Sequence, residues 1–125
     1  MRLLSVLLLA LTTSSIHAQT TWHVDDDLKD NPKADFTDIQ SAIDAASDGD
    51  EILVAPGTYI GSDTEVVNML GKEITLRSSD GPDVTIIDGE SAKRGITCGS
   101  GETSNTIIDG FTITNGNAIN SNGGG

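Results

Sequence analysis

Three consecutive acidic residues, Asp25, Asp26 and Asp27, form the densest group of possible metal ligands in the sequence. Calcium prefers oxygen ligands such as carboxylates. Consecutive side chains converge on one ion only where a shaped loop turns them inward, and no glycine stands at a suitable turn position here. We therefore expect a solvated acidic loop, and we keep these three residues as weak candidate ligands for calcium, the only cofactor considered.

A second acidic pattern comes from the sequence Thr-Ile-Ile-Asp-Gly, which occurs at residues 85–89 and again at 106–110. If these copies stack, Asp88 and Asp109 lie in one column with Asn68 one repeat earlier. Like charges placed directly opposite each other are unfavourable, so these residues either share a cation or face solvent at a corner. The glycine after each aspartate is a turn signal and favours the corner.

Residues that often carry catalysis stand alone in this sequence. Cys98 is the only cysteine, which excludes an intrachain disulfide, and it has no histidine nearby. His23 lacks a second histidine or a cysteine for a metal site. Arg77 and Arg94 have no visible acid–base partner, so surface roles are expected for both. No catalytic residue is therefore predicted.

The chain is acidic, with a formal net charge of −12 at pH 7. Such a surface repels nucleic-acid phosphates and anionic lipids, and it suits a soluble extracellular protein. Aromatic residues are few. Trp22 and Tyr59 could stack on sugar rings if they were exposed, but packing within the core is the favoured expectation for both.

The elements that must position these residues begin with a strand at 21–24 and a polar loop at 25–35. Apolar residues then recur at helical spacing, which predicts a helix over 38–47. Thr37 and Gln40 fit a capping box at its start, and Gly49 is a plausible residue after its end. A strand at 51–55 follows, and Pro56-Gly57 reads as a turn. Five residues carry the helical pattern: Phe36, Ile39, Ala42, Ile43 and Ala46.

From the strand at 51–55 onward the sequence repeats with a period of 20 to 22 residues. The repeated positions are rich in Ile, Val and Thr, which favour strands, and no helical pattern occurs among them. This predicts an all-β solenoid of about three coils, in which equivalent side chains stack. The predicted inward columns are Ile52–Ile74–Ile96 and Val54–Leu76–Cys98, with Leu53, Thr75 and Thr97 facing outward.

Three segments follow from these patterns. Residues 1–18 have the basic start, apolar centre and small terminal residue of a secretory signal peptide. Residues 19–50 form an N-terminal strand, loop and capping helix, and residues 51–125 form the coils. A fourth coil is expected to begin near residue 118. An open last coil would expose strand edges, so we expect this sequence to be the start of a longer protein rather than to end in a docking face for a partner.

The stretches at 35–46 and 49–59, the latter ending in Pro-Gly-Thr-Tyr, resemble the N-terminal region of the pectin lyase-like superfamily. The segments at 72–78, 85–89 and 110–116 continue the likeness, which covers about residues 22–125. The resemblance implies a right-handed parallel β-helix, but it brings no matching catalytic motif. We expect a secreted or cell-surface module without catalysis, used for structure, adhesion or contact with polysaccharide or other surface components. The alternative is the N-terminal part of a pectate lyase-like or pectinesterase-like enzyme whose active site lies beyond residue 125.

Overall fold

The computed structural model describes residues 18–118. The predicted signal peptide at 1–18 and the predicted fourth coil therefore lie outside the described residues, apart from Ala18 and Ala118. The described chain forms one helix and nine strands. Their bounds are β1 Thr21–Val24, α1 Ile39–Ala45, β2 Glu51–Val54, β3 Gly57–Tyr59, β4 Glu65–Asn68, β5 Thr75–Ser78, β6 Thr85–Asp88, β7 Arg94–Thr97, β8 Ile107–Asp109 and β9 Thr112–Thr114.

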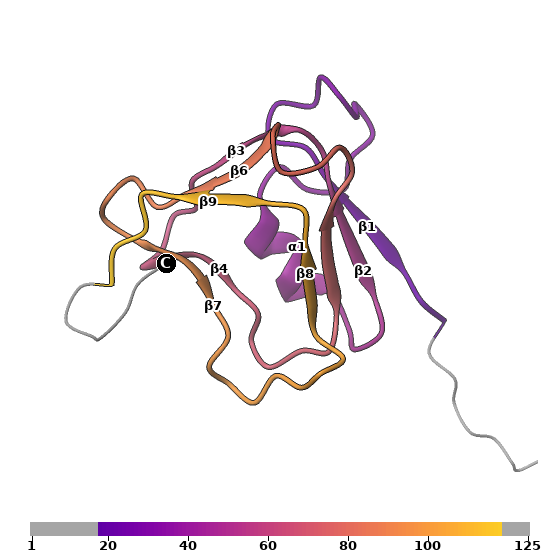
Figure 1. The fold of residues 1–125 in the computed structure, drawn as a ribbon. Coiled ribbons are helices and arrows are strands. Elements are labelled where there is room, and N and C mark those ends of the chain that lie inside the picture. Colours follow the sequence, from indigo (N-terminus) through magenta and orange to yellow (C-terminus); the bar gives the residue numbers. More distant parts are fainter. Residues whose placement is uncertain (1–17, 119–125) are drawn as a thin grey trace, which may run out of the picture.

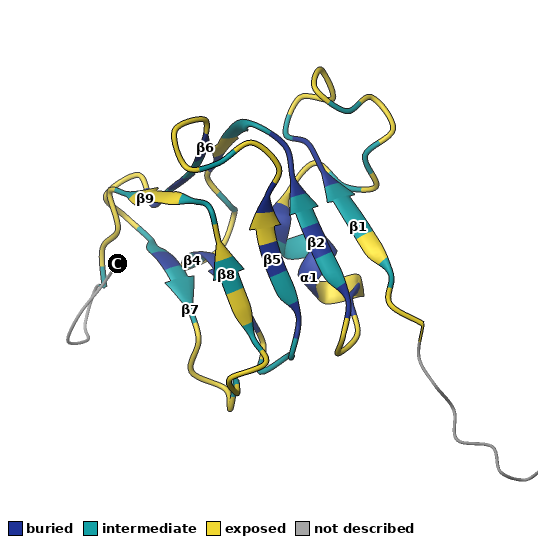
Figure 2. Ribbon diagram, turned by 45° about the vertical axis from the view of Figure 1, so that its right-hand side comes forward, coloured by how far each residue is buried: buried dark blue, intermediate teal, exposed yellow. Residues whose placement is uncertain are grey.

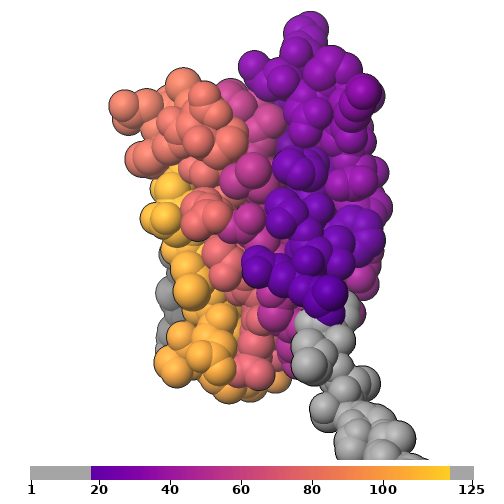
Figure 3. All heavy atoms as spheres, turned by 90° about the vertical axis from the view of Figure 1, so that its right-hand side faces the viewer, coloured from indigo at the N-terminus to yellow at the C-terminus, as the bar shows by residue number. Residues whose placement is uncertain are grey.

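The strands stack into a parallel β-solenoid of about three turns, which confirms the predicted fold class. The strands form three separate sheets, in the orders β1-β2-β5-β8, β3-β6-β9 and β4-β7, and each strand pair is parallel. The three stacks outline a triangle around a common interior (Figure 1). In the space-filling view the turns appear as successive bands, from indigo at the N-terminal end to yellow (Figure 3).

Alternation along each strand decides which side chains enter the core. Ile52 and Val54 of β2 are fully buried, whereas Leu53 between them is only half-buried. Because side chains of a strand point to opposite faces in turn, Ile52 and Val54 lie on the inner face. Ile52 stacks on Leu76 in the next turn.

The predicted stacking columns were wrong, because the turns are longer and less equal than the sequence period. Thr75 lies 24 residues after its partner Glu51, and Ile107 lies 32 residues after Thr75. The corners between strands absorb this difference. The observed columns are Trp22–Ile52–Leu76–Ile108 and Val24–Val54–Ser78, while Ile74 precedes β5 and Ile96 stacks on Val67 of another sheet.

The two copies of Thr-Ile-Ile-Asp-Gly also occupy different sheets. Asp88 ends β6 and stacks on Thr114, whereas Asp109 ends β8 and stacks on Arg77. Asn68 ends β4 and stacks on Thr97. The predicted column of Asp88, Asp109 and Asn68 is therefore wrong, and the question of a cation shared between them does not arise.

Helix α1 packs against β1, β2 and β4 and places Ile39, Ala42 and Ile43 in the core. Its N-cap is Asp38, whose Oδ1 accepts a hydrogen bond of 2.8 Å from the Ser41 amide, so the predicted Thr37–Gln40 capping box was wrong. Figure 2 shows α1 behind β1 and β2.

The C-terminal end of α1 is closed by a lysine from the next turn. The Lys72 ammonium donates to the carbonyl oxygens of Ile43, Asp44 and Ala46 at 2.6, 3.1 and 2.7 Å. These are among the carbonyls that a helix end leaves without partners. The helix ends at Ala45 with Ala46 as C-cap, so Gly49 is not the residue directly after the cap. The lysine does the capping that the sequence suggested for glycine.

The two ends of the solenoid differ. At the N-terminal end, the carboxylate of Asp50 ties β1 to the residues after α1, through bonds from the Thr20 and Ser47 amides. At the other end, Ile113 in the last described strand of its sheet stacks on the buried Ile87 and is nearly half exposed. In the described chain, one end of the core is therefore covered and the other is not.

Candidate functional site

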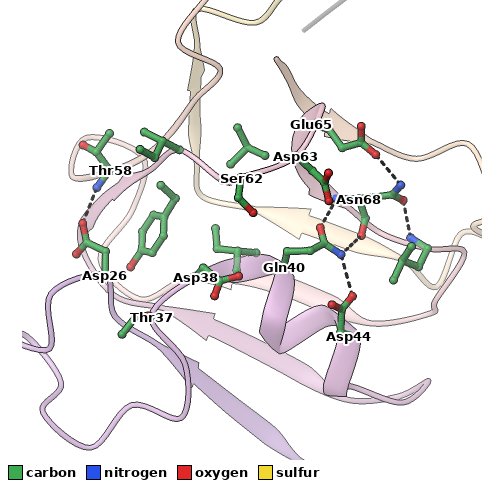
Figure 4. Close-up of a pocket in the computed structure, with 16 residues that line it drawn as sticks. Asp26, Thr37, Asp38, Gln40, Asp44, Thr58, Ser62, Asp63, Glu65 and Asn68 are labelled. Atoms are coloured by element: carbon green, nitrogen blue, oxygen red, sulfur yellow. Dashed lines mark hydrogen bonds between the residues drawn. The ribbon is translucent and has the colours of Figure 1, made fainter. Parts of the chain in front are cut away.

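A cleft of about 500 Å³ lies between α1, the corner that joins β3 to β4, and β4 itself (Figure 4). Asp38, Gln40 and Asp44 line it from the helix side, and Ser62, Asp63 and Glu65 line it from the opposite side. This volume is within the range of small-molecule sites in proteins. The remaining lining residues are Asp26, Thr37, Ile39, Thr58, Tyr59, Ile60, Gly61, Val66, Asn68 and Leu70.

Gln40 fixes the helix wall of the cleft against β4. Its Nε2 donates to the Asn68 carbonyl at 3.1 Å and to Asp44 Oδ1 at 3.2 Å, and its Oε1 accepts from the Asn68 amide at 2.8 Å. The side-chain amide thus gives Asn68 the donor and acceptor that a neighbouring strand would give. This satisfies part of the edge of β4, where unpaired backbone groups would otherwise remain.

The opposite wall is a tight corner that requires glycine. Gly61 has φ of +62°, and a Cβ there would lie 2.8 Å from the Val66 Cα. The corner is also held from the next turn, because the Lys93 ammonium donates to the Ile60 carbonyl at 3.0 Å. Both walls of the cleft are therefore set by contacts between segments far apart in the sequence.

Buried aromatic and aliphatic residues form the floor of the cleft. Tyr59 is 4% exposed, and its hydroxyl donates to the Ala55 carbonyl at 2.9 Å. Burial raises the pKa of this phenol, and the nearby Asp26 carboxylate adds to the rise. Tyr59 belongs to the core, as the sequence suggested, and its ring cannot serve as an exposed platform for sugars. Ile60 and Leu70 are 45% and 43% exposed and add apolar surface at the lining.

Five carboxylates line the cleft, and four of them accept hydrogen bonds from neutral groups of the protein. Asp38 accepts from Ser41, Asp44 from Gln40, Asp26 from the Thr58 amide and Glu65 from Asn68. Asp63 is exposed at the corner. Each carboxylate offers about four acceptor positions, so these bonds leave capacity for a ligand. The cleft can therefore accept hydrogen bonds from hydroxyl or ammonium groups.

The candidate calcium residues are only partly brought together. Carboxylate oxygens of Asp25, Asp27 and Asp30 lie within 4.8 Å of one another, whereas Asp26 accepts from the Thr58 amide on β3. Asp25 is fully buried and accepts from the Asn31 amide at 2.6 Å, which organises the loop.

Asp27 in this loop has a cationic neighbour of its own. Its Oδ2 lies 2.9 Å from the Lys29 ammonium, and the hydrogen bond from Lys29 lowers the pKa of Asp27. Lys29 thus neutralises part of the charge of the group formed by Asp25, Asp27 and Asp30, and calcium binding at this loop stays a prediction.

The cysteine and the two arginines singled out in the sequence occupy structural positions, and the predicted position of the cysteine was wrong. Cys98 is exposed, not buried in a column as predicted, because it follows β7 at a corner. Partial burial, together with Glu102, raises the pKa of its thiol and disfavours the thiolate. Arg77 forms an ion pair with Glu51 on the neighbouring strand, and Arg94 lies in β7 beside Glu65.

Two further predicted residues help to fix β1. Trp22 packs against Phe36, with ring centroids 5.7 Å apart, and its Nε1 donates to Asp50 at 3.1 Å. His23 contributes its backbone: its amide donates to Asp35 Oδ2 at 2.8 Å, and its carbonyl accepts from the Asp35 amide. Both residues therefore have structural roles, as expected from the sequence.

The amino-acid sequence did not predict the cleft. Gln40 had been assigned to a capping box, and Asp38, Asp44 and Asp63 had no role. The contact between α1 and β4 joins residues 28 positions apart, and no local pattern encodes it. The glycine at position 61 is the one signal that could have marked a special corner.

No helix of the described chain is both long and apolar enough to cross a bilayer. Comparison with protein-family models, with curated proteins and with solved structures found no match to this chain.

Proposed function

We propose that this chain is a non-catalytic, secreted or cell-surface solenoid module that binds saccharide in the cleft beside α1. The cleft supports this proposal because it combines hydrogen-bond acceptors with apolar surface. A sugar ring presents hydroxyl donors at its edge and C–H groups on its faces, and a small-molecule site usually pairs an apolar lining with a few placed polar groups. The cleft of about 500 Å³ with Gln40, Asp44 and Asp63 on its walls is the observation that carries the proposal.

We further propose that the module is the start of a pectin lyase-like, right-handed β-helix protein, with residues 1–18 as its signal peptide. The parallel register and the helix before the first full turn are compatible with the resemblance at 35–46 and 49–59. The net charge of −12 favours uncharged or cationic partners at the cell surface over nucleic acid.

The lining of the cleft supplies hydrogen-bond acceptors for a ligand. Its described residues include acids, amides and hydroxyls, but no histidine, cysteine, lysine or arginine. The alternative function is the N-terminal part of a polysaccharide lyase or carbohydrate esterase. In that case the active site is formed by residues beyond 125, and this chain supplies only the first turns.

Binding can be tested by titrating the protein with neutral oligosaccharides and following amide shifts by NMR. We expect saturable shifts for the corner residues 60–64. Ser62→Tyr, which places a ring in the cleft, should abolish them. Ser104→Tyr places the same ring at an exposed corner between β7 and β8 and should leave binding unchanged.

Two results would count against the proposal. If no oligosaccharide shifts the residues of the cleft, or if Ser62→Tyr binds as well as the wild type, the cleft is not the site. If this protein turned over polygalacturonate or its methyl ester, with or without calcium, the enzyme alternative would replace the non-catalytic module.

A further inference from the structure

The cleft beside α1 has a strongly asymmetric lining. Five of its lining residues are acidic, and the described lining contains no lysine, arginine or histidine. Asp38 and Asp44 stand on the helix side, and Asp63 and Glu65 stand across from them (Figure 4). A group that enters the cleft therefore meets carboxylates from both walls.

Lys72 and Lys93 contact segments that form the walls but are not among the lining residues of the cleft. Lys72 donates to the carbonyls at the end of α1, and Lys93 donates to the Ile60 carbonyl and forms an ion pair with Glu90. Glu65 has a cationic neighbour in Arg94, its partner in the next turn. The charges of Asp26, Asp38, Asp44 and Asp63 thus remain without a described cationic neighbour among the lining residues.

Apolar surface lies beside these charges. Ile60 and Leu70 are among the large hydrophobic residues with the greatest exposure in the described chain, and both line the cleft. An inorganic cation would gain nothing from this surface, whereas an organic ligand with C–H groups would bury it. The lining therefore fits a molecule that joins a positive charge to an apolar face.

We propose that the ligand is an amino sugar, whose protonated amine is attracted by the carboxylates of Asp44 and Asp63 while a C–H face of its ring packs on Ile60 or Leu70. This inference rests on the proposed saccharide binding and specifies its chemical class. Anionic polysaccharides such as polygalacturonate are excluded from the cleft by the same carboxylates. A neutral sugar satisfies the hydrogen bonds but forgoes the attraction between opposite charges.

The test compares two oligosaccharides of equal length, a glucosamine oligomer and its fully N-acetylated counterpart. Calorimetric titration should give tighter binding for the glucosamine oligomer. Its affinity should fall as salt is added, because salt screens exposed charges, while the affinity of the acetylated oligomer should change little. Polygalacturonate should not compete.

A charge-neutralising variant tests whether Asp44 and Asp63 cause the preference for the glucosamine oligomer. Asp44→Asn combined with Asp63→Asn keeps one acceptor oxygen at each position and removes two charges. Exposed ion pairs correspond to roughly a twofold to fivefold change in affinity each, so the double variant should lose about fourfold to 25-fold in affinity for the glucosamine oligomer alone. The matched control, Asp80→Asn with Asp83→Asn, removes two exposed charges at the turn after β5 and should bind as the wild type does.

The outcomes separate this inference from the function on which it rests. Equal affinity for the two oligomers, or unchanged affinity in the Asp44/Asp63 variant, would overturn the amino-sugar assignment and leave saccharide binding in place. Failure of both oligomers to bind would overturn both proposals. Asp38 is left unchanged in all variants because it caps α1, and the circular dichroism spectrum of each variant should match that of the wild type.

Discussion

Replacing Asp50 tests how the N-terminal end of the solenoid is held. Its side chain is 2% exposed and accepts at least three hydrogen bonds, from the Thr20 amide at 2.9 Å, the Trp22 indole at 3.1 Å and the Ser47 amide at 2.9 Å. Asp50→Ala leaves these donors without an acceptor. Each buried donor without a partner costs about 1–3 kcal/mol, and water reaches some of them because they are only part-buried. We expect a total loss of about 3–5 kcal/mol in the free energy of unfolding.

Asp50→Asn separates charge from shape. It keeps one acceptor oxygen but turns an amide N–H toward the remaining donors, so we expect a loss of about 1–3 kcal/mol. Asp80→Asn, at an exposed turn, should change stability by less than about 0.5 kcal/mol. A domain of this size has a total stability of about 5–15 kcal/mol, so the Asp50→Ala loss is readily measured.

The assay is urea unfolding followed by far-ultraviolet circular dichroism and by the fluorescence of Trp22, the only tryptophan. The slope of free energy against urea should stay constant while the midpoint falls. If Asp50→Ala unfolds within about 1 kcal/mol of the wild type, the three bonds do not hold β1 in place. The account of the N-terminal end would then be refuted.

Further predictions concern single positions in the described chain. Thr85 is fully buried and its hydroxyl has no partner among the described residues, so Thr85→Val should stabilise the protein by about 1 kcal/mol in urea unfolding. A Cβ at Gly57 would lie 2.5 Å from Asp26 Oδ1, so Gly57→Ala should destabilise by about 1–3 kcal/mol, and adding Asp26→Ala should restore part of the loss. Hydrogen bonds from Thr103 and Asn105 hold the pKa of Glu73 below its ordinary 4.5. The Glu73 carboxylate therefore contributes its full stabilisation above pH 4.5, and this stabilisation is lost as the pH falls through the lowered pKa. Glu73→Gln should flatten the pH dependence of the unfolding free energy between about pH 6 and about pH 3. Cys98 is exposed, so native protein should take up one maleimide without denaturant, and a need for unfolding would contradict its position.

The fold class could be predicted because strand-forming residues and polar or glycine-rich corners alternate from the strand at 51–54 onward in the described chain. The predicted strand at 21–24 coincides with β1. The strand predicted at 51–55 is one residue longer than β2, and the helix predicted at 38–47 extends one or two residues beyond each end of α1. These elements depend on local patterns of apolar residues, which a sequence displays directly.

The stacking register could not be predicted, because it depends on corner length rather than on strand composition. Equivalent strands are separated by 24 residues between β2 and β5 but by 32 between β5 and β8. The repeated Thr-Ile-Ile-Asp-Gly suggested equal turns, yet its copies lie in β6 and β8, on two different sheets. A sequence repeat here marks a similar strand and corner, not the same position in successive turns. Cys98 was misplaced by this error.

The cleft owes its existence to the way α1 meets the sheet. A strand beside β4 would satisfy the edge with its own backbone and leave no hollow. Instead, one side chain, that of Gln40, makes both bonds to Asn68. The helix can then run past the strand edge with Asp38 and Asp44 on the flank that lines the space opposite the 60–64 corner. The contact that satisfies the edge of β4 is thus also the contact that shapes one wall of the cleft, and Gln40 belongs among the residues that build the proposed saccharide site.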